Sequence, residues 1–220
     1  MSDPEHAYLS ATRSAYDTVA ANYADQLADH LAQQPFDRAA LAAYAELVHA
    51  AADGITPRVT EVGCGPGRIT AHLAGLGLCA SGIDLSPAMV DEARRRHPGI
   101  GFTVGSMTAL DLPERQLDGI VAWYSVIHVP PAEHRAVYAG FRRALKAGGH
   151  LLLAFQVGDE RREITEAYGH SGLCCDAYRL APDRVEEDLA ASGFAPVARL
   201  TRAPVGPEKQ PQAYLIARAL

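Results

Sequence analysis

Closely spaced glycines between two acids are the first sign of chemistry in this sequence. Residues 59–62 read Val-Thr-Glu-Val, and residues 63–67, Gly-Cys-Gly-Pro-Gly, follow directly. Glycines at the end of a strand, where a helix begins, let a ligand approach the backbone closely. Asp84 ends the next apolar run, 23 positions after Glu61, and a carboxylate there can hold ribose hydroxyls. The loop and Asp84 together predict a nucleoside-binding site.

The positions of the glycines distinguish two kinds of nucleoside cofactor. The dinucleotide fingerprint G-x-G-x-x-G would place its third glycine where this chain has Arg68, whereas the pattern here is G-x-G-x-G. A carboxylate at Glu61 disfavours a pyrophosphate and suits an ammonium or a sulfonium cation. S-adenosylmethionine (SAM) carries both cations and no phosphate. The pattern therefore favours SAM, with a nicotinamide oxidoreductase as the less favoured alternative.

His128 is the candidate for moving a proton. It follows the apolar run 117–123 at a distance of five residues. In methyl transfer from SAM, alignment supplies much of the catalysis, and a base is needed when the acceptor starts protonated. Imidazole titrates near neutral pH, so His128 is predicted to be catalytic. The alternative is a structural role, in which His128 orients the turn before Pro130.

Short apolar runs alternate with helical segments around these residues. Predicted strands cover residues 58–62, 78–84, 101–105, 117–123 and 150–157. Predicted helices cover residues 67–76, 87–97 and 130–146, and a helix from Pro182 precedes two last strands, 194–201 and 212–219. This alternation is typical of βαβ units, in which helices cover both faces of a parallel sheet. The glycine loop and Asp84 would then lie at the carboxyl edge of that sheet.

Two helical patterns precede the first predicted strand. Tyr16, Val19, Tyr23 and Leu27 recur at spacings of three and four, which places them on one helical face. A second apolar stripe covers residues 36–51 and ends at Asp53-Gly54. We expect residues 1–220 to form one domain, with a helical cover over residues 1–56 and an α/β core over residues 57–220. Residues 158–180 are assigned no element and are expected to help cover the site.

Composition and charge exclude several classes of partner. The net charge is −6, and 48% of the 220 residues are hydrophobic, which is typical of a folded soluble protein. Nucleic acid is not expected as a partner, because its backbone requires clustered Lys and Arg, and no apolar stretch is long enough to cross a membrane. The four cysteines lack the spacing of a zinc site, so no metal is expected. We expect a cytoplasmic protein, whose oligomeric state the composition leaves open.

From Arg58 to Asp159 the sequence resembles a class I SAM-dependent methyltransferase. The family's acid followed by G-x-G-x-G, and its later ribose-binding acid, match Glu61, Gly63, Gly65, Gly67 and Asp84. The resemblance implies an α/β fold with a doubly wound, mostly parallel sheet of seven strands, which is Rossmann-like, beneath an N-terminal helical cover. It also implies SAM as the cofactor and S-adenosylhomocysteine as its product.

The same resemblance assigns residues to the adenine ring. Leu85 and Met89 match positions that lie against adenine in this family. Ser106, followed by Met107, stands where the family often has an acid that binds the adenine amino group; serine keeps one hydrogen bond and lacks the charge. Met89 alone would be compatible with packing in the core.

The resemblance also places aromatic residues beside the cofactor. Residues 16–23 resemble the helix that closes over SAM in enzymes acting on small molecules, which implies that Tyr16 and Tyr23 face the cofactor. From periodicity alone, both tyrosines are equally compatible with the core. Trp123, at the end of the fourth predicted strand, is a further expected cofactor contact.

The acceptor is expected to be a small molecule. Candidate contacts are Tyr124, beside the fourth strand, and Tyr168 and His170, in a segment that often shapes the acceptor pocket of this family; the alternative for the last two is a solvated loop. Residues 123–129 contain no acid, which disfavours the magnesium-dependent catechol type. The prediction is metal-independent methyl transfer to an oxygen or a nitrogen. The alternative is a SAM-fold protein that catalyses a cyclisation or only binds SAM.

Overall fold

Helices and strands alternate in the computed structural model, which describes residues 4–52 and 54–220; the predicted helix end at Asp53 lies outside these residues. The α-helices are α1 (Pro4–Gln26), α2 (Pro35–Ala51), α3 (Arg68–Gly75), α4 (Pro87–Arg96), α5 (His134–Ala144) and α6 (Pro182–Ala191). Short 3₁₀ helices are η1 (His30–Gln33), η2 (Met107–Ala109), η3 (Val126–His128) and η4 (Pro131–Glu133). None of the helices in this part of the chain has the length and apolar character that a membrane span requires.

Seven of the strands form one sheet in the order β3-β2-β1-β4-β5-β9-β8. The strands are β1 (Arg58–Val62), β2 (Cys79–Asp84), β3 (Gly101–Val104), β4 (Leu117–Trp123), β5 (Leu145–Gln156), β8 (Phe194–Arg202) and β9 (Gln212–Ala219). Strands from β3 to β5 pair in parallel, whereas β9 pairs antiparallel with β5 and β8. The strand order reverses between β1 and β4, and open α/β sheets bind ligands at such a point. The predicted doubly wound, mostly parallel fold is confirmed.

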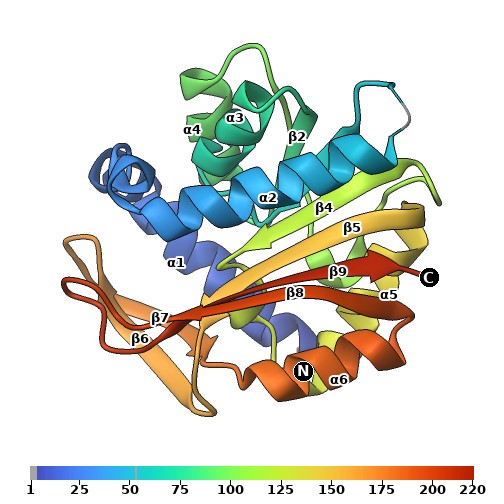
Figure 1. Ribbon diagram of the computed structural model, residues 1–220. Helices are drawn as coiled ribbons and strands as arrows, with labels where there is room; N and C mark the ends of the chain where they lie inside the picture. The colour runs from blue at the N-terminus through green and yellow to red at the C-terminus, as the bar shows by residue number, and fades with distance from the viewer. Residues whose placement is uncertain (1–3, 53) are drawn as a thin grey trace.

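Helices cover both faces of this sheet, which explains the apolar runs of its central strands. In β5, Leu152 belongs to the core under α2 and α3, while Leu151 and Leu153 belong to the core under α5 and α6. Successive side chains of a strand point to opposite faces, so a strand covered on both sides is apolar throughout. Figure 1 shows α2 lying across the front of the sheet and α6 along its lower edge.

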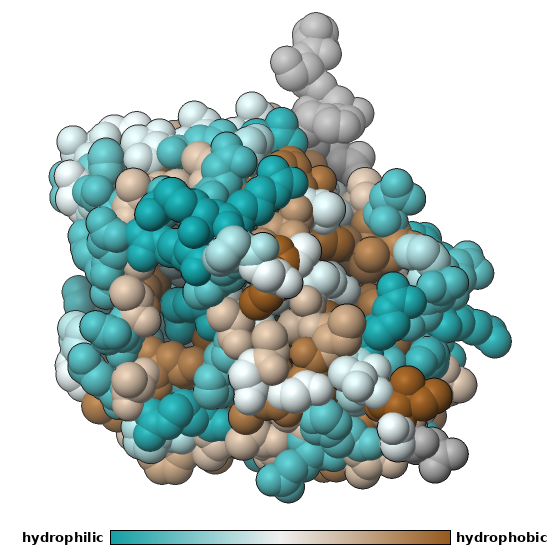
Figure 2. All heavy atoms as spheres, turned by 90° about the horizontal axis from the view of Figure 1, so that it is seen from above, coloured by the Kyte–Doolittle hydropathy of each residue, from teal (hydrophilic) through white to brown (hydrophobic). Residues whose placement is uncertain are grey.

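The outer surface is mixed in polarity. Its exposed large apolar side chains are scattered over separate elements: Phe36, Ile55, Val104, Val197, Val205 and Leu220. Seen from above, hydrophilic and hydrophobic areas alternate over the face of the molecule (Figure 2). Single exposed apolar residues are normal on folded proteins, so none of these positions by itself marks a functional site.

A β-hairpin occupies the segment to which the sequence pattern assigned no element. β6 (Arg161–Ala167) and β7 (His170–Tyr178) pair antiparallel in a separate sheet. The turn between them, Tyr168-Gly169, has φ values of 51° and 82°, and positive values at both positions are what a type I′ turn requires. Asn, Asp and Gly are the usual signals of this turn. Because its first position is a tyrosine, the hairpin is not predicted from the sequence.

The boundary between α5 and β5 also differs from the prediction. The helix predicted over 130–146 ends at Ala144, and β5 begins at Leu145 rather than at His150. Leu145 pairs with Leu117 of β4 ahead of a bulge, which draws the residues after the helix into the sheet.

Candidate active site

A cavity opens at the carboxyl ends of β1, β2 and β4, at the point where the strand order reverses. This first cavity measures about 710 Å³ out to its open mouth. Ten of the twelve predicted cofactor contacts line it: Tyr16, Tyr23, Gly63, Gly65, Asp84, Leu85, Met89, Ser106, Met107 and Trp123. Tyr124 and His128 line it as well. The wall also includes residues that the sequence did not single out: Leu9, Thr12, Arg13, Ser86, Gly105, Ser125 and Val129.

The glycine loop leaves its backbone open to the first cavity. Gly63 has φ 77° and Gly65 has φ 53°. At Gly63 a Cβ atom would lie 2.2 Å from the Cβ atom of Ser125, so only glycine fits there. At Gly65 the nearest side-chain atom would be 3.8 Å away, and a Cβ atom would take up cavity space instead. The two glycines form a cradle in which a ligand can lie against the backbone.

Asp84 joins the glycine loop to the start of α4. Its Oδ2 accepts a hydrogen bond from the N–H of Gly65 at 2.7 Å, and its Oδ1 accepts one from the N–H of Ser86 at 2.8 Å. A carboxylate has about four acceptor positions, so each oxygen keeps capacity for a hydroxyl. Burial raises the pKa of Asp84 above its usual value, and the two N–H donors oppose this rise. The geometry suits the ribose-binding role expected of this residue.

Glu61 and Gly67 are not among the residues that line the first cavity. Glu61 is buried beneath the loop, and its Oε2 accepts a hydrogen bond from the Thr70 hydroxyl at 2.5 Å. Burial raises the pKa of Glu61 to about 8. Gly67 precedes α3 with φ 81°, and a Cβ atom there would lie 2.7 Å from the ring of Phe102. Gly67 therefore serves packing, and Glu61 would carry its charge only where a bound cation favours the ionised carboxylate.

Apolar side chains form another part of the first cavity wall. Leu85, Met89 and Met107 all line it, and Met89 is 1% exposed. The hydroxyl of Ser106 lies 2.8 Å from the Thr108 hydroxyl and accepts the Thr108 N–H at 3.3 Å. These residues offer an apolar surface with one hydroxyl at its edge, which suits a flat aromatic ring with polar substituents.

Polar contacts hold α1 over the first cavity. Asp17 of α1 accepts a hydrogen bond from the Ser86 hydroxyl at 2.5 Å, at the N-terminus of α4. The partial positive charge at a helix N-terminus favours a carboxylate there. Farther along α1, Asp25 pairs with Arg96 at 2.5 Å. These two attachments position the tyrosines of α1 in the cavity wall.

Tyr16 and His128 form a hydrogen-bonded pair in the first cavity. Tyr16 Oη lies 2.6 Å from His128 Nε2, and His128 Nδ1 lies 2.7 Å from the backbone oxygen of Asp176 in β7. A carbonyl oxygen can only accept, so Nδ1 is assigned the hydrogen and Nε2 accepts from the Tyr16 hydroxyl. Burial lowers the pKa of His128 and raises that of Tyr16. The site therefore presents a tyrosine hydroxyl backed by a neutral imidazole.

A second cavity of about 1180 Å³ adjoins the first, and Tyr16, Tyr23 and Tyr124 line both. Its wall combines α1, the hairpin, the ends of β4 and β5, and the loop between β8 and β9. Tyr168, an expected substrate contact, lies in this wall. His170, the other expected contact from that segment, begins β7 and is not among the lining residues of either cavity.

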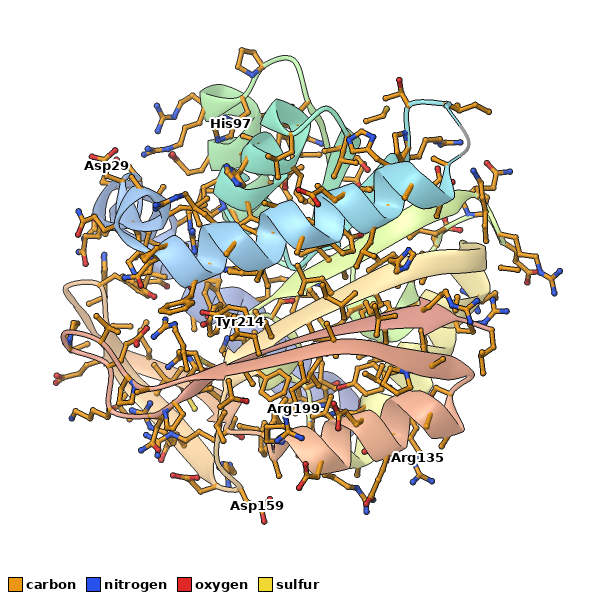
Figure 3. The ribbon with its side chains drawn as sticks, in the orientation of Figure 1. Asp29, His97, Arg135, Asp159, Arg199 and Tyr214 are labelled. Carbon is orange, nitrogen blue, oxygen red and sulfur yellow. The ribbon has the colours of Figure 1, made fainter. Side chains whose placement is uncertain are left out.

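A buried polar network supports the wall of the second cavity. Tyr214 of β9 donates a hydrogen bond to Asp37 of α2 at 2.5 Å and accepts one from Nε of Arg202 at 3.0 Å. Arg202 also binds both carboxylate oxygens of Glu208, at 2.5 and 2.7 Å. Figure 3 shows Tyr214 between α2 and the sheet. Asp37 and Arg202 are 1% and 7% exposed, so the network is shielded from solvent.

The described residues contain neither a metal-binding cluster nor a disulfide. No group of three or more His, Cys, Asp or Glu side chains suited to hold a metal ion occurs in residues 4–52 and 54–220. The cysteines Cys64, Cys79, Cys174 and Cys175 are all free. The polar groups that face the first cavity include the Asp84 carboxylate, the Tyr16–His128 pair and the backbone of the glycine loop.

Comparisons with known proteins agree with this geometry. Residues 59–149 match the sequence model of a family described as a methyltransferase domain. The chain is 36% identical to trans-aconitate 2-methyltransferase from Methylobacterium nodulans over 108 residues, which cover 48% of this chain and 40% of that protein. It is 31% identical to an uncharacterized methyltransferase of Mycobacterium tuberculosis over 119 residues, which cover 52% of this chain and 48% of the relative. The chain thus matches about half the length of its curated relatives, or less.

A solved structure shares the whole fold. It is 1,6-didemethyltoxoflavin-N1-methyltransferase of Burkholderia thailandensis, with 1,6-didemethyltoxoflavin and S-adenosylhomocysteine bound. The match has a TM-score of 0.68 at 21% identity and covers 100% of this chain and 92% of that chain. The fold is therefore the Rossmann-like fold of class I methyltransferases. Residues 59–149 are thus similar in sequence to a methyltransferase domain, and the chain shares the fold of such enzymes.

Proposed function

We propose that this protein transfers a methyl group from SAM to an oxygen or nitrogen atom of a small molecule, without a metal ion. The observation that carries the proposal is the junction of two cavities at Tyr16, Tyr23 and Tyr124. The first cavity holds the glycine loop and Asp84, and the second has room for an acceptor. Two similar proteins support a small acceptor: one is named for trans-aconitate, and the other holds 1,6-didemethyltoxoflavin.

The residues of the first cavity fit SAM. Asp84 can accept hydrogen bonds from the ribose hydroxyls, and the cradle at Gly63 and Gly65 can receive the amino-acid portion. Leu85, Met89 and Met107 offer an apolar surface for adenine. A sulfonium and an ammonium in this cavity would lie near the acids Asp84 and Glu61, which favour positive charge.

The chain's own residues would position the acceptor and remove its proton. Bound SAM supplies a methyl group on a good leaving group, so alignment provides much of the rate. The Tyr16 hydroxyl can accept the acceptor's proton while its own proton moves to Nε2 of His128. The backbone oxygen of Asp176, bound to Nδ1–H, then stabilises the imidazolium. We favour oxygen as the acceptor atom, because a hydroxyl needs this removal of a proton.

We also propose the compartment in which the protein acts and the kind of substrate it takes. We place the protein in the cytoplasm, acting as one domain on a small molecule rather than on nucleic acid or at a membrane. The net charge of −6 and the free cysteines support this setting.

A methyl-transfer assay tests this function. The protein is incubated with SAM labelled with tritium in its methyl group and with fractions of small metabolites. We expect label in a small product, with an equal amount of S-adenosylhomocysteine formed. Transfer to no fraction, by protein that binds S-adenosylhomocysteine, contradicts methyl transfer and favours a protein that only binds SAM or catalyses a cyclisation.

A further inference from the structure

The wall of the second cavity contains more positive than negative side chains. It includes the basic residues Arg68, Arg162, Arg179 and Lys209 and the acids Asp37 and Glu208. The excess is opposite in sign to the net charge of the chain, which is −6. His30 also lies in this wall, and burial lowers its pKa, which keeps the imidazole neutral.

The two acids of this wall are already paired with an arginine that is not a lining residue. Arg202 binds Glu208 through both carboxylate oxygens, and its Nη2 lies 3.6 Å from Asp37. Asp37 also accepts the Tyr214 hydroxyl. Arg202 balances one of these two carboxylates, so the wall together with Arg202 still holds more positive than negative charge.

Three of the four basic residues have no ion pair with any residue that the structure describes. Arg179 pairs with Glu160, outside the cavity wall. Within residues 4–52 and 54–220, no acid lies within ion-pair distance of Arg68, Arg162 or Lys209. Nη1 of Arg68 is buried and has no hydrogen-bond partner among these residues. Leaving a buried charged donor without a partner costs free energy, so an anionic ligand here would stabilise the site.

The positions of these cations point to the acceptor. Arg68 begins α3 directly after the glycine loop, whereas Arg162 of β6 and Lys209 of the β8–β9 loop are exposed. All three line the second cavity, and none of them lines the first. A guanidinium binds a carboxylate through parallel hydrogen bonds, and a lysine adds a point charge.

We propose that the acceptor is an anionic small molecule, whose negative charge is bound by basic side chains in the wall of the second cavity: Arg162 and Lys209, which are exposed, and Arg68, which is half-buried. This inference rests on the proposed function, since it takes the second cavity as the acceptor site. The amino-acid portion of SAM also carries a carboxylate. Arg68 follows the glycine loop, so the test must distinguish the acceptor's carboxylate from the cofactor's.

Matched acids and amides test the proposal. The probes are 4-hydroxybenzoate, indole-3-acetate and tricarballylate, each paired with its primary amide and titrated by calorimetry with and without S-adenosylhomocysteine. We expect at least one acid to bind roughly tenfold or more tightly than its amide. We expect the Arg162→Gln/Lys209→Gln double variant to reduce that preference to within about threefold. Arg199→Gln, which removes a basic residue that lines neither cavity, serves as the matched control and should keep the preference.

Two outcomes overturn the proposal. One is that no acid binds better than its amide, and the other is that the preference survives in the double variant. Both substituted side chains are exposed, so a failure to fold does not confuse the result. The titrations without S-adenosylhomocysteine measure the preference even if wild-type protein fails to bind that molecule, which would contradict the proposed function instead.

Arg68→Gln separates the two carboxylates. It is titrated with the acids, with S-adenosylhomocysteine and with 5′-methylthioadenosine, which lacks the amino-acid portion. Weaker binding of the acids, with unchanged affinity for both nucleosides, supports the acceptor site. Weaker binding of S-adenosylhomocysteine alone, with an unchanged acid preference, assigns Arg68 to the cofactor and overturns its part in the proposal.

Discussion

The Tyr16 hydroxyl donates its hydrogen bond to Nε2 of His128 across 2.6 Å, from α1 to the turn after β4. The other ring nitrogen of His128 is held by the backbone oxygen of Asp176. His128 thus has no free nitrogen to offer an acceptor in this arrangement, and Tyr16 lines both cavities whereas His128 lines the first. The pair acts as one unit in the proposed reaction.

Tyr16→Phe is expected to lower turnover about as much as His128→Ala does. General bases contribute roughly 10²–10⁴-fold, and residues that act as a unit are not additive, so the double variant should be no slower than the worse single variant. The measurement is kcat with an acceptor found by the methyl-transfer assay. If the losses of kcat are additive in the double variant, Tyr16 and His128 act independently.

Tyr138→Phe is the matched control for that series. The hydroxyl of Tyr138 is buried in the core under α5 without a hydrogen-bond partner in the described part of the chain. Its removal is expected to leave kcat unchanged. A loss of turnover as large as that of Tyr16→Phe would show that any tyrosine hydroxyl in this fold affects the rate indirectly.

Asp84→Ala is expected to weaken binding of S-adenosylhomocysteine by more than about tenfold, since two hydrogen bonds to ribose at roughly 1–3 kcal/mol each would be lost. Calorimetric titration measures the affinity. Asp118→Asn is the control, because Asp118 is the second residue of β4 and accepts the Arg58 N–H at the opposite edge of the sheet. If Asp84→Ala binds S-adenosylhomocysteine as tightly as wild type does, Asp84 does not bind the ribose.

Glu61→Gln is expected to change how stability depends on pH. Burial raises the pKa of Glu61 from 4.5 to about 8, so between these values the folded protein holds a proton that the unfolded chain releases. This contribution to stability is full below about pH 4.5 and is lost as pH rises through about 8. Urea unfolding of ligand-free protein between pH 5 and pH 8 should therefore show a smaller decline in Glu61→Gln than in wild type. Equal declines in both proteins contradict the burial of a protonated Glu61.

Gly63→Ala is expected to destabilise the protein by about 2–4 kcal/mol, because alanine disfavours positive φ and its Cβ atom would overlap Ser125. Gly75→Ala is the control, since a Cβ atom at that helical position would meet no atom within 4 Å. The control should be neutral or slightly stabilising. Thermal unfolding of both variants measures the difference, and equal stability would contradict the close packing of the loop on Ser125.

Strands β4, β5 and β9 are predictable because each carries a buried apolar run. Leu151, Leu152 and Leu153 face two cores, and this burial on both faces shows directly in the sequence. The hairpin is different, because β6 is largely exposed and has no apolar period. Its turn at Tyr168 adopts a positive φ that tyrosine seldom takes, so the sequence carries no clear signal.

The candidate site is predictable where its residues are close in sequence. The glycine loop and Asp84 belong to one βαβ unit, and all but Glu61 and Gly67 of the expected cofactor contacts line the first cavity. Which ring nitrogen of His128 carries the hydrogen depends on the backbone oxygen of Asp176, 48 residues away. Asp176 belongs to a hairpin that the sequence does not reveal. Arg68 was available as a signal, since it is a basic residue directly after the glycine loop. That its Nη1 atom has no hydrogen-bond partner in the described part of the chain becomes visible only once the fold brings the walls of the second cavity together.

Calorimetric titration with S-adenosylhomocysteine, with NADH in parallel, tests the central claim most directly. The glycine spacing, the cradle at Gly65 and the free acceptor capacity of Asp84 predict micromolar binding of S-adenosylhomocysteine and none of NADH. Binding of NADH alone, or of neither molecule, would contradict the assignment of the first cavity to SAM.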